Sequence, residues 1–332
     1  MKKLNEYVNK NTYIHEKLTI VHKSYSCAPE KKEELKYIIK ERLDQDPNAD
    51  LNDIDVSNIT DMSELFNGLN PRNIDISEWD VSNVENMHYM FNYCQNFNSD
   101  LSTWDVSNVK DMSVMFNMCK NFDSDLSTWD VSNVEDMSEI FCGCESFNSD
   151  LSNWNVSKVE DMCSMFDNCK NFDSDLSAWD VSNVKSMENM FFNCKKFNSD
   201  LSRWDVSKVE EMTCMFWKCE KFNSDLSDWD VSNVESMSTM FSDCTKFNSD
   251  LSRWNVSNVK YTIKMFKNCE NFNSDISNWN VSKLESMAEM FFNCKKFTAD
   301  LSGWDVSNVT WMQDVFKGCS SLRPRPKWSK KQ

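Results

Sequence analysis

Glycine, proline and histidine are scarce in this sequence, with 4, 5 and 3 copies among 332 residues. Average usage of ~7% glycine and ~5% proline would give several times as many of each. So few glycines exclude the glycine-rich loops that bind phosphates and dinucleotides. Three histidines that do not recur leave little for histidine-based catalysis or metal binding. No apolar run reaches the ~18 residues that a transmembrane helix needs.

Positive charge is also in short supply, because 53 acidic side chains outnumber 36 basic ones and give a net charge of −17. Nucleic acids and anionic membranes attract basic surfaces, so we predict no nucleic-acid partner and no membrane insertion. Acidity is concentrated in residues 51–319, which hold 21 basic and 44 acidic side chains, whereas residues 320–332 hold 5 basic and none acidic. Such a surface favours a basic protein partner.

A strict period of 25 residues runs through most of the chain. Cysteine recurs ten times from Cys94 to Cys319, and phenylalanine eleven times from Phe66 to Phe316. Tryptophan recurs ten times from Trp79 to Trp304. An uninterrupted period of this length indicates stacked supersecondary units. We therefore predict a repeat solenoid of about eleven coils over residues 51–322, with an N-terminal segment over 1–50 and a basic C-terminal tail over 323–332.

The apolar pattern changes its period within each unit. Residues 101–106 alternate like a short strand, with Trp104 and Val106 on the inner face. Residues 112–119 carry apolar side chains at helical spacing, and a Ser with Glu three residues later, such as Ser132 and Glu135, resembles a helix capping box. Each coil is therefore expected to contain a strand, a turn and a short helix, with a parallel sheet on one side.

A separate helix is expected over residues 29–43. Leu35, Ile38, Ile39 and Leu43 fall on one helical stripe. Because one coil cannot bury enough surface alone, the ends of a stack need covers. We expect this helix to cover the first coil.

The repeated residues form columns along the stack. The ten column cysteines are interpreted as buried structural thiols, with disulfides between neighbouring coils or a metal site as alternatives. The tryptophan column is interpreted as core. Four cysteines lie off the column and are expected to face solvent, which suits a reducing compartment: Cys27, Cys142, Cys163 and Cys214.

Two further columns carry carboxylates. One holds ten Asp from Asp75 to Asp300, and the other holds eight Asp, with Asn155, Asn255 and Asn280 as replacements. Like charges in neighbouring coils are tolerated when each carboxylate accepts hydrogen bonds, so a structural role in turns is favoured. Ca²⁺ held between coils is the alternative.

The unit Met-Phe-x-x-Cys-x-x-Phe-x-x-Asp-Leu-Ser-x-Trp-Asp-Val-Ser-Asn-Val, as in Met115–Val134, resembles the repeat of BspA-like proteins and mycoplasma-type surface lipoproteins. The resemblance covers about residues 51–322. It implies a leucine-rich-repeat-like solenoid with a role in binding or adhesion at the cell surface. The first residues lack the apolar segment of a secretory signal. That absence and the many cysteines favour a cytoplasmic location instead.

Identical coils imply no unique catalytic cleft, so we predict a protein that is not an enzyme and that needs no cofactor or metal. The position before each tryptophan is the variable one on the predicted sheet face, and we take it as the binding surface. Its proposed members are Glu78, Thr103, Thr128, Asn153, Arg203, Asp228, Arg253 and Asn278, with Ala178 and Gly303 in the same column. The predicted function is a protein-interaction or adhesion scaffold. A purely structural rod and a Ca²⁺-stabilised module are the alternatives.

Overall fold

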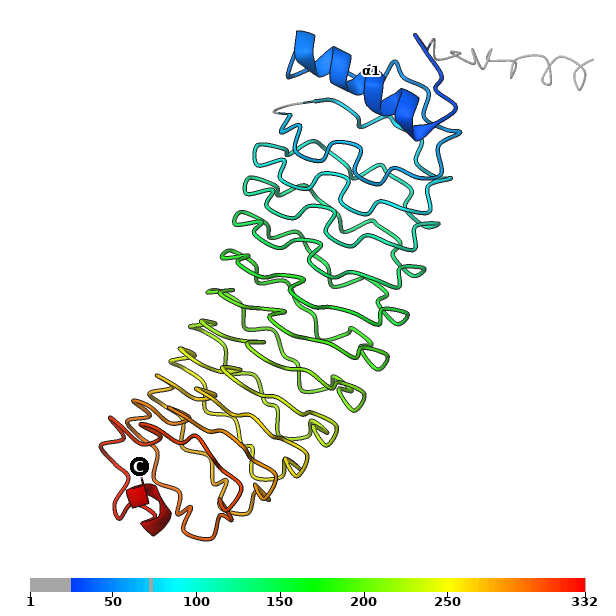
Figure 1. Cartoon of the computed structure of the whole chain (residues 1–332). Helices are drawn as coiled ribbons and strands as arrows, with labels where there is room; N and C mark the ends of the chain where they lie inside the picture. The colour runs from blue at the N-terminus through cyan, green and yellow to red at the C-terminus, as the bar shows by residue number, and fades with distance from the viewer. Residues whose placement is uncertain (1–24, 72–73, 332) are drawn as a thin grey trace, which may run out of the picture.

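The computed structural model describes residues 25–71 and 74–331. In these residues the chain forms an elongated stack of similar coils (Figure 1). Helix α1, Lys32–Gln45, lies across the N-terminal end of the stack, and the 3-10 helix η1, Lys327–Lys331, lies at the other end. Isolated parallel bridges join equivalent residues of successive coils from Asp61↔Asn86 to Ser286↔Trp311.

The backbone of each coil differs from the sequence prediction. The short helix predicted over residues 112–119 is wrong, because α1 and η1 are the only helices among the described residues. Val114 and Met118 adopt left-handed φ values of 59° and 62°, and all their counterparts in the other coils do the same. A right-handed helix cannot contain such residues. The segment 101–106, predicted as a strand, contains a tight turn in which the Trp104 amide donates to the Leu101 carbonyl.

The left-handed residues create a set of inter-coil hydrogen bonds that we call the peptide ladder. The peptide group between Thr213 and Cys214 accepts from the Asn189 amide and donates from its own N–H to the Ser238 carbonyl, both at 2.9 Å. Three more peptide groups in the same coil bond in the same way, and they precede Met212, Phe216 and Lys218. Every ladder N–H therefore points toward the C-terminal end of the stack, and every ladder carbonyl toward the N-terminal end.

The alternate amides of the same segment close turns within their own coil. The amides of Met215, Trp217 and Cys219 donate to the carbonyls three residues before them, at 3.0–3.3 Å. The predicted capping boxes are therefore also wrong. The amide of Ser132 donates to the Asp130 carboxylate at 3.0 Å and caps no helix.

On the opposite side, peptide groups join the coils at the N-terminal end, as where the Leu51 amide donates to the Asp75 carbonyl at 2.9 Å, and side chains connect the later coils. The indole Nε1 of Trp104 donates to the Ile76 carbonyl of the preceding coil at 3.0 Å. Its ring stacks on Trp79 with centroids 6.4 Å apart. Nearby, the amide of Asn108 donates to the Ser82 carbonyl at 2.7 Å. The tryptophan column is buried core, as its interpretation required.

The column cysteines are buried free thiols. Each contacts a carbonyl of the preceding coil, as where Cys194 Sγ donates to the Phe166 carbonyl at 3.0 Å. Burial raises the pKa of these thiols, to about 12 at Cys94. The column thus supplies one weak hydrogen bond per coil, and this bond requires the protonated thiol.

Both carboxylate columns form turns. Asp100 accepts from the amide of Ser102 at 2.9 Å, and these hydrogen bonds hold the pKa of Asp100 below its ordinary value. Asn155 makes the same turn, accepting from the Ser157 amide at 3.2 Å. A neutral side-chain oxygen is therefore enough to form this turn, and the predicted structural role of the two columns is confirmed.

The two ends of the stack are covered differently. Leu35 and Ile39 of α1 are buried, and Lys32 Nζ lies 2.6 Å from Asp61 Oδ2 in the first complete coil. At the other end Trp328 stacks on Trp304 with centroids 6.4 Å apart and donates to the Leu301 carbonyl, as a column tryptophan does. The segment predicted as a basic tail therefore forms a partial cap.

Candidate interaction face

Four outward side chains per coil line the peptide ladder, and we call their surface the variable face. In one coil they are Thr213, Cys214, Trp217 and Lys218, and the equivalent residues lie 25 positions apart along the chain. The residues between them, Met212, Met215 and Phe216 in this coil, are buried. The inward residues are nearly constant from coil to coil, whereas the outward ones differ in charge, size and polarity.

Carboxylates and thiols gather on the variable face around Asp167. The equivalent positions in the preceding and following coils hold Cys142 and Phe192, so the side chains on both sides of Asp167 in the stack are apolar. Burial and then the nearby Glu139 raise the pKa of Asp167 to about 7, although its Oδ1 accepts from Asn168 Nδ2 at 2.6 Å. This part of the face holds a carboxyl group that changes charge near neutral pH.

The off-column cysteines lie partly within this region. The structure shows Cys142, Cys163, Cys214 and Cys27 partly buried, so the expectation that they face solvent is confirmed only in part. Burial raises the pKa of Cys142 to about 12 and also raises those of Cys163 and Cys214. Packing between the outward side chains of neighbouring coils covers them.

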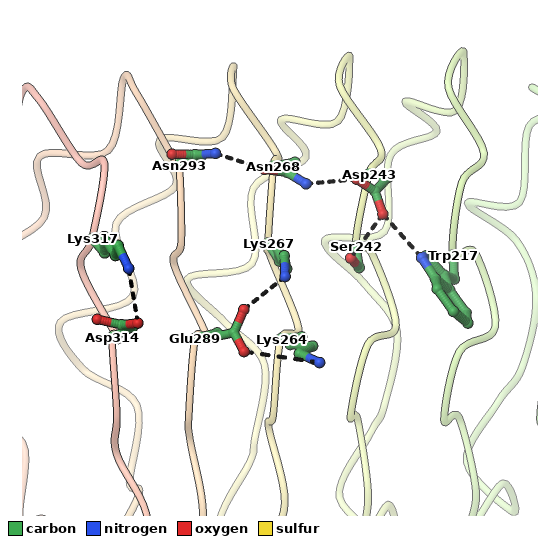
Figure 2. Close-up of polar contacts among 10 residues, drawn as sticks. All are labelled: Trp217, Ser242, Asp243, Lys264, Lys267, Asn268, Glu289, Asn293, Asp314 and Lys317. Atoms are coloured by element: carbon green, nitrogen blue, oxygen red, sulfur yellow. Dashed lines mark hydrogen bonds and ion pairs between the residues drawn. The ribbon is translucent and has the colours of Figure 1, made fainter.

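An aromatic pair follows on the same face. The rings of Phe192 and Trp217 stack with centroids 4.6 Å apart. The ammonium of Lys218 lies 4.8 Å from the Trp217 centroid and 5.5 Å from that of Phe192, within cation–π distance. Trp217 Nε1 donates to Asp243 Oδ2 at 3.0 Å, which fixes the orientation of the indole (Figure 2).

Asp243 connects the aromatic pair to a row of amides. Its other oxygen accepts from Asn268 Nδ2 at 2.7 Å, and Asn268 Oδ1 accepts from Asn293 Nδ2 at 2.9 Å. Figure 2 shows this row running across three coils, with Ser242 also donating to Asp243 at 3.2 Å. The row presents polar groups whose positions are fixed by one another.

Lysines dominate the last part of the variable face. Lys267 and Lys264 flank Glu289 at 2.7 and 3.8 Å (Figure 2). Lys267 and Lys317 also lie 5.0 and 5.6 Å from the ring centroid of Phe292. The variable face therefore carries an acidic region around Asp167, an aromatic pair in the next coils, and a last part in which amides and lysines lie in the same coils.

The column predicted as the binding surface lies on the opposite side, in turns rather than on a sheet. Its residues from Glu78 to Asn278 are exposed. Thr103 and Thr128 donate to carbonyls of the preceding coil at 2.6 and 2.9 Å. Asp228 and Arg253 form an ion pair at 2.7 Å. Some residues of this column thus join neighbouring coils, and the column remains a predicted binding surface.

Sequence reasoning did not identify the variable face, because a helix was expected there and variation on its outer side has no special meaning. The signal was present in the changes at the positions of Cys214, Trp217 and Lys218 from coil to coil. The predicted column varies at one position per coil, whereas the variable face varies at four.

Comparison with known proteins identifies a family. No curated protein matches the chain. Within the residues that the structure describes, no helix has the length and apolarity to cross a bilayer. Residues 34–153, 135–252 and 224–330 each match the family described as Mycoplasma protein of unknown function, DUF285. These three matches together span most of the sequence, and the chain belongs to this repeat family.

Proposed function

We propose that the chain is a non-enzymatic protein-interaction scaffold whose partners bind along the variable face. The observation that carries this proposal is the contrast between nearly constant inward residues and sets of four outward residues that differ from coil to coil. A rod with only a mechanical role needs the constant residues alone. A surface that changes from acidic to aromatic to basic along its length suits recognition of a specific partner.

The aromatic pair provides the strongest candidate contact. Tryptophan and other aromatic residues are enriched where interfaces concentrate their binding energy. Trp217 is held by Phe192, Lys218 and Asp243, so little side-chain entropy is lost when a partner covers it. The neighbouring carboxylates at Glu139 and Asp167 favour a partner that places basic side chains beside its apolar contact.

The resemblance to BspA-like repeats supports this class of function, and we propose a leucine-rich-repeat-like solenoid on the same basis. For location, we favour the cytoplasm over the cell surface. Fourteen cysteines, all present as free thiols, support a reducing compartment.

The test compares three versions of the full chain as bait in a lysate of the source cells. One carries Phe192→Asn and Trp217→Asn, because Asn stands at the equivalent position in Asn92 and Asn117 and is tolerated by the coil. The other carries Arg203→Ala and Arg253→Ala in the predicted column. We expect a partner that binds wild type to be lost, about tenfold or more, only in the first variant.

Equal melting temperatures of the three proteins provide the folding control. Loss only in the Arg variant would return the site to the predicted column. Binding unchanged in both variants would favour a uniform rod. A rise in melting temperature with millimolar Ca²⁺, reversed by chelator, would instead support the Ca²⁺-stabilised module.

A further inference from the structure

The last coil leaves the peptide ladder unfinished. In the preceding coil the amides of Glu289, Phe291 and Asn293 donate to carbonyls of the last coil at 2.8–3.0 Å. The equivalent amides of the last coil belong to Asp314, Phe316 and Gly318, and no described residue accepts a hydrogen bond from them. Because every ladder N–H points toward the C-terminal end, the last coil exposes hydrogen-bond donors there. A segment that covers this end must present carbonyl oxygens to them.

Apolar side chains are also incompletely covered at this end. Val306, Val309 and Met312 are partly exposed, although their counterparts in the earlier coils are buried. In the valine column of Val306, for example, no earlier valine exceeds 4% exposure. A hollow of about 440 Å³ lies against these three residues and Trp304. The cap formed by Leu322 and Trp328 covers the other half of the coil.

The same end is basic in an otherwise acidic protein. Arg323 and Arg325 line a second hollow of about 400 Å³ together with Gly318 and Leu322. Arg325 is held there by a hydrogen bond from Nη2 to the Phe316 carbonyl at 3.0 Å. Residues 320–332 contain five basic side chains and no acidic one. An acidic ligand is therefore favoured over a neutral or basic one.

We propose that the C-terminal end of the stack binds an acidic peptide segment of a partner protein, which adopts the turns of a coil and adds to the ladder as half a coil. Three features converge on this ligand. The ladder amides bind its carbonyls, the hollow beside Val309 binds its apolar side chains, and the arginines attract its carboxylates. Main-chain pairing of this kind, with pockets for side chains, is a known mode of peptide recognition. The proposal does not depend on the variable face.

The earlier coils show what sequence fits. Carbonyls of Ser138, Ile140 and Cys142 accept from the ladder amides of the coil before them at 2.6–2.9 Å. Apolar residues at 131, 134 and 137 lie over the counterparts of Val306, Val309 and Met312. The segment 130–143 also contains four acidic side chains and no basic one. A peptide with the pattern Val-x-x-Val-x-x-Met, a net negative charge and the same turns has the required groups.

The probe is a fluorescein-labelled peptide with the sequence of residues 130–143, with Ser at the Cys142 position to prevent oxidation. Its binding to the full chain is measured by fluorescence anisotropy. We expect saturable binding that is weakened about tenfold or more by Arg323→Glu with Arg325→Glu, and also by Val309→Asp. The matched charge control is Lys31→Glu, at the N-cap of α1, with Lys40→Glu on that helix. This end of the stack is the opposite one, so the control should change the Kd less than about twofold.

A scrambled peptide of the same composition should bind about tenfold more weakly, because it keeps the charge and loses the spacing. Absence of saturable binding to wild type would overturn the proposal. Equal affinity for the scrambled peptide would mean that only charge attracts the peptide, and this result would also overturn the proposal. Sedimentation that shows self-association, lost on Arg323→Glu with Arg325→Glu, would identify a second copy as the occupant in place of a partner peptide. Unchanged melting temperatures show that the variants fold.

Discussion

Replacement of Asp167 by Asn should stabilise the protein at alkaline pH. The carboxyl group is partly buried between the levels of Cys142 and Phe192, and its pKa is raised to about 7 from an ordinary value of 3.8. Between about pH 4 and pH 7, the carboxyl group of Asp167 is therefore protonated in the folded protein and already ionised in the unfolded chain. Asn keeps the shape and an oxygen that accepts from Asn168 Nδ2, and it carries no charge.

The sign and size of the expected change in the free energy of unfolding follow from the linkage between protonation and folding. Below about pH 4 both states are protonated and the carboxyl group costs nothing. As pH rises from about 4 to 7, the unfolded state ionises first, so the free energy of unfolding of wild type falls. The full difference in pKa corresponds to about 4 kcal/mol. Because the side chain keeps some contact with water, we expect Asp167→Asn to gain about 1–2 kcal/mol at pH 8 and nothing at pH 4.

Urea unfolding followed by tryptophan fluorescence at pH 4, 6 and 8 provides the measurement. Asp130→Asn is the matched control, since Asn occurs in that column and hydrogen bonds from Ser132 lower the pKa of Asp130. The wild-type carboxylate at 130 stabilises above its ordinary pKa, and this contribution is lost as pH falls. The control should therefore be neutral or slightly destabilising at pH 8, opposite in sign to Asp167→Asn.

A gain from Asp167→Asn that is the same at pH 4 and pH 8 would refute the reasoning, because it would not come from ionisation. A loss at pH 8 would refute it as well, and would mean that the ionised carboxylate has a favourable partner in the folded protein.

Three further outcomes are expected. Trp204→Phe should lower the free energy of unfolding by about 2–3 kcal/mol in urea, because it removes the Nε1 hydrogen bond to the Leu176 carbonyl and leaves that oxygen buried. Gly143→Ala should lower it by about 1–2 kcal/mol, because φ is +75° and the new Cβ would meet Met118 Sδ at 2.5 Å, whereas Gly303→Ala enters open space and should be neutral. Thiol labelling without reductant should leave the ten column cysteines unreacted in the native protein and reach fourteen in denaturant; a native count near ten would contradict their burial.

The repeat made the inward residues predictable and left the backbone unpredictable. Trp104 and Val106 lie inward as expected, since a side chain that recurs every 25 residues must stack on its own copies. The spacing of apolar residues between 112 and 119 fits a helix and a pair of tight turns equally well. Both conformations place these apolar side chains on one face. The turns require left-handed residues, and a β-branched residue such as Val114 normally disfavours that conformation.

A signal for the left-handed residues did exist in the sequence. The register of Met118 contains Gly68, Gly143 and Gly318, which are three of the four glycines in the chain, and four of its other members are Asn. Glycine and asparagine are the residues that adopt positive φ most readily. The candidate site was missed because a helix was expected there, and variation on the outer side of a helix has no special meaning.

The ladder gives the stack a net electrical polarity, because its four rows of peptide groups point one way and a single continuous row points the other. In that single row the Lys110 amide donates to the Glu85 carbonyl of the preceding coil at 2.9 Å. Each peptide group carries a dipole of about 3.5 D, and in each of the four ladder chains these dipoles align head to tail along the axis of the stack. In an α-helix the positive end is the N-terminal one; here the amide hydrogens point toward the C-terminal end, so that end is positive. The negative end lies beneath α1, where Lys32 Nζ approaches Asp61 and Ser63. Adding or deleting whole coils would change the distance between the two poles and leave the sign at each end the same.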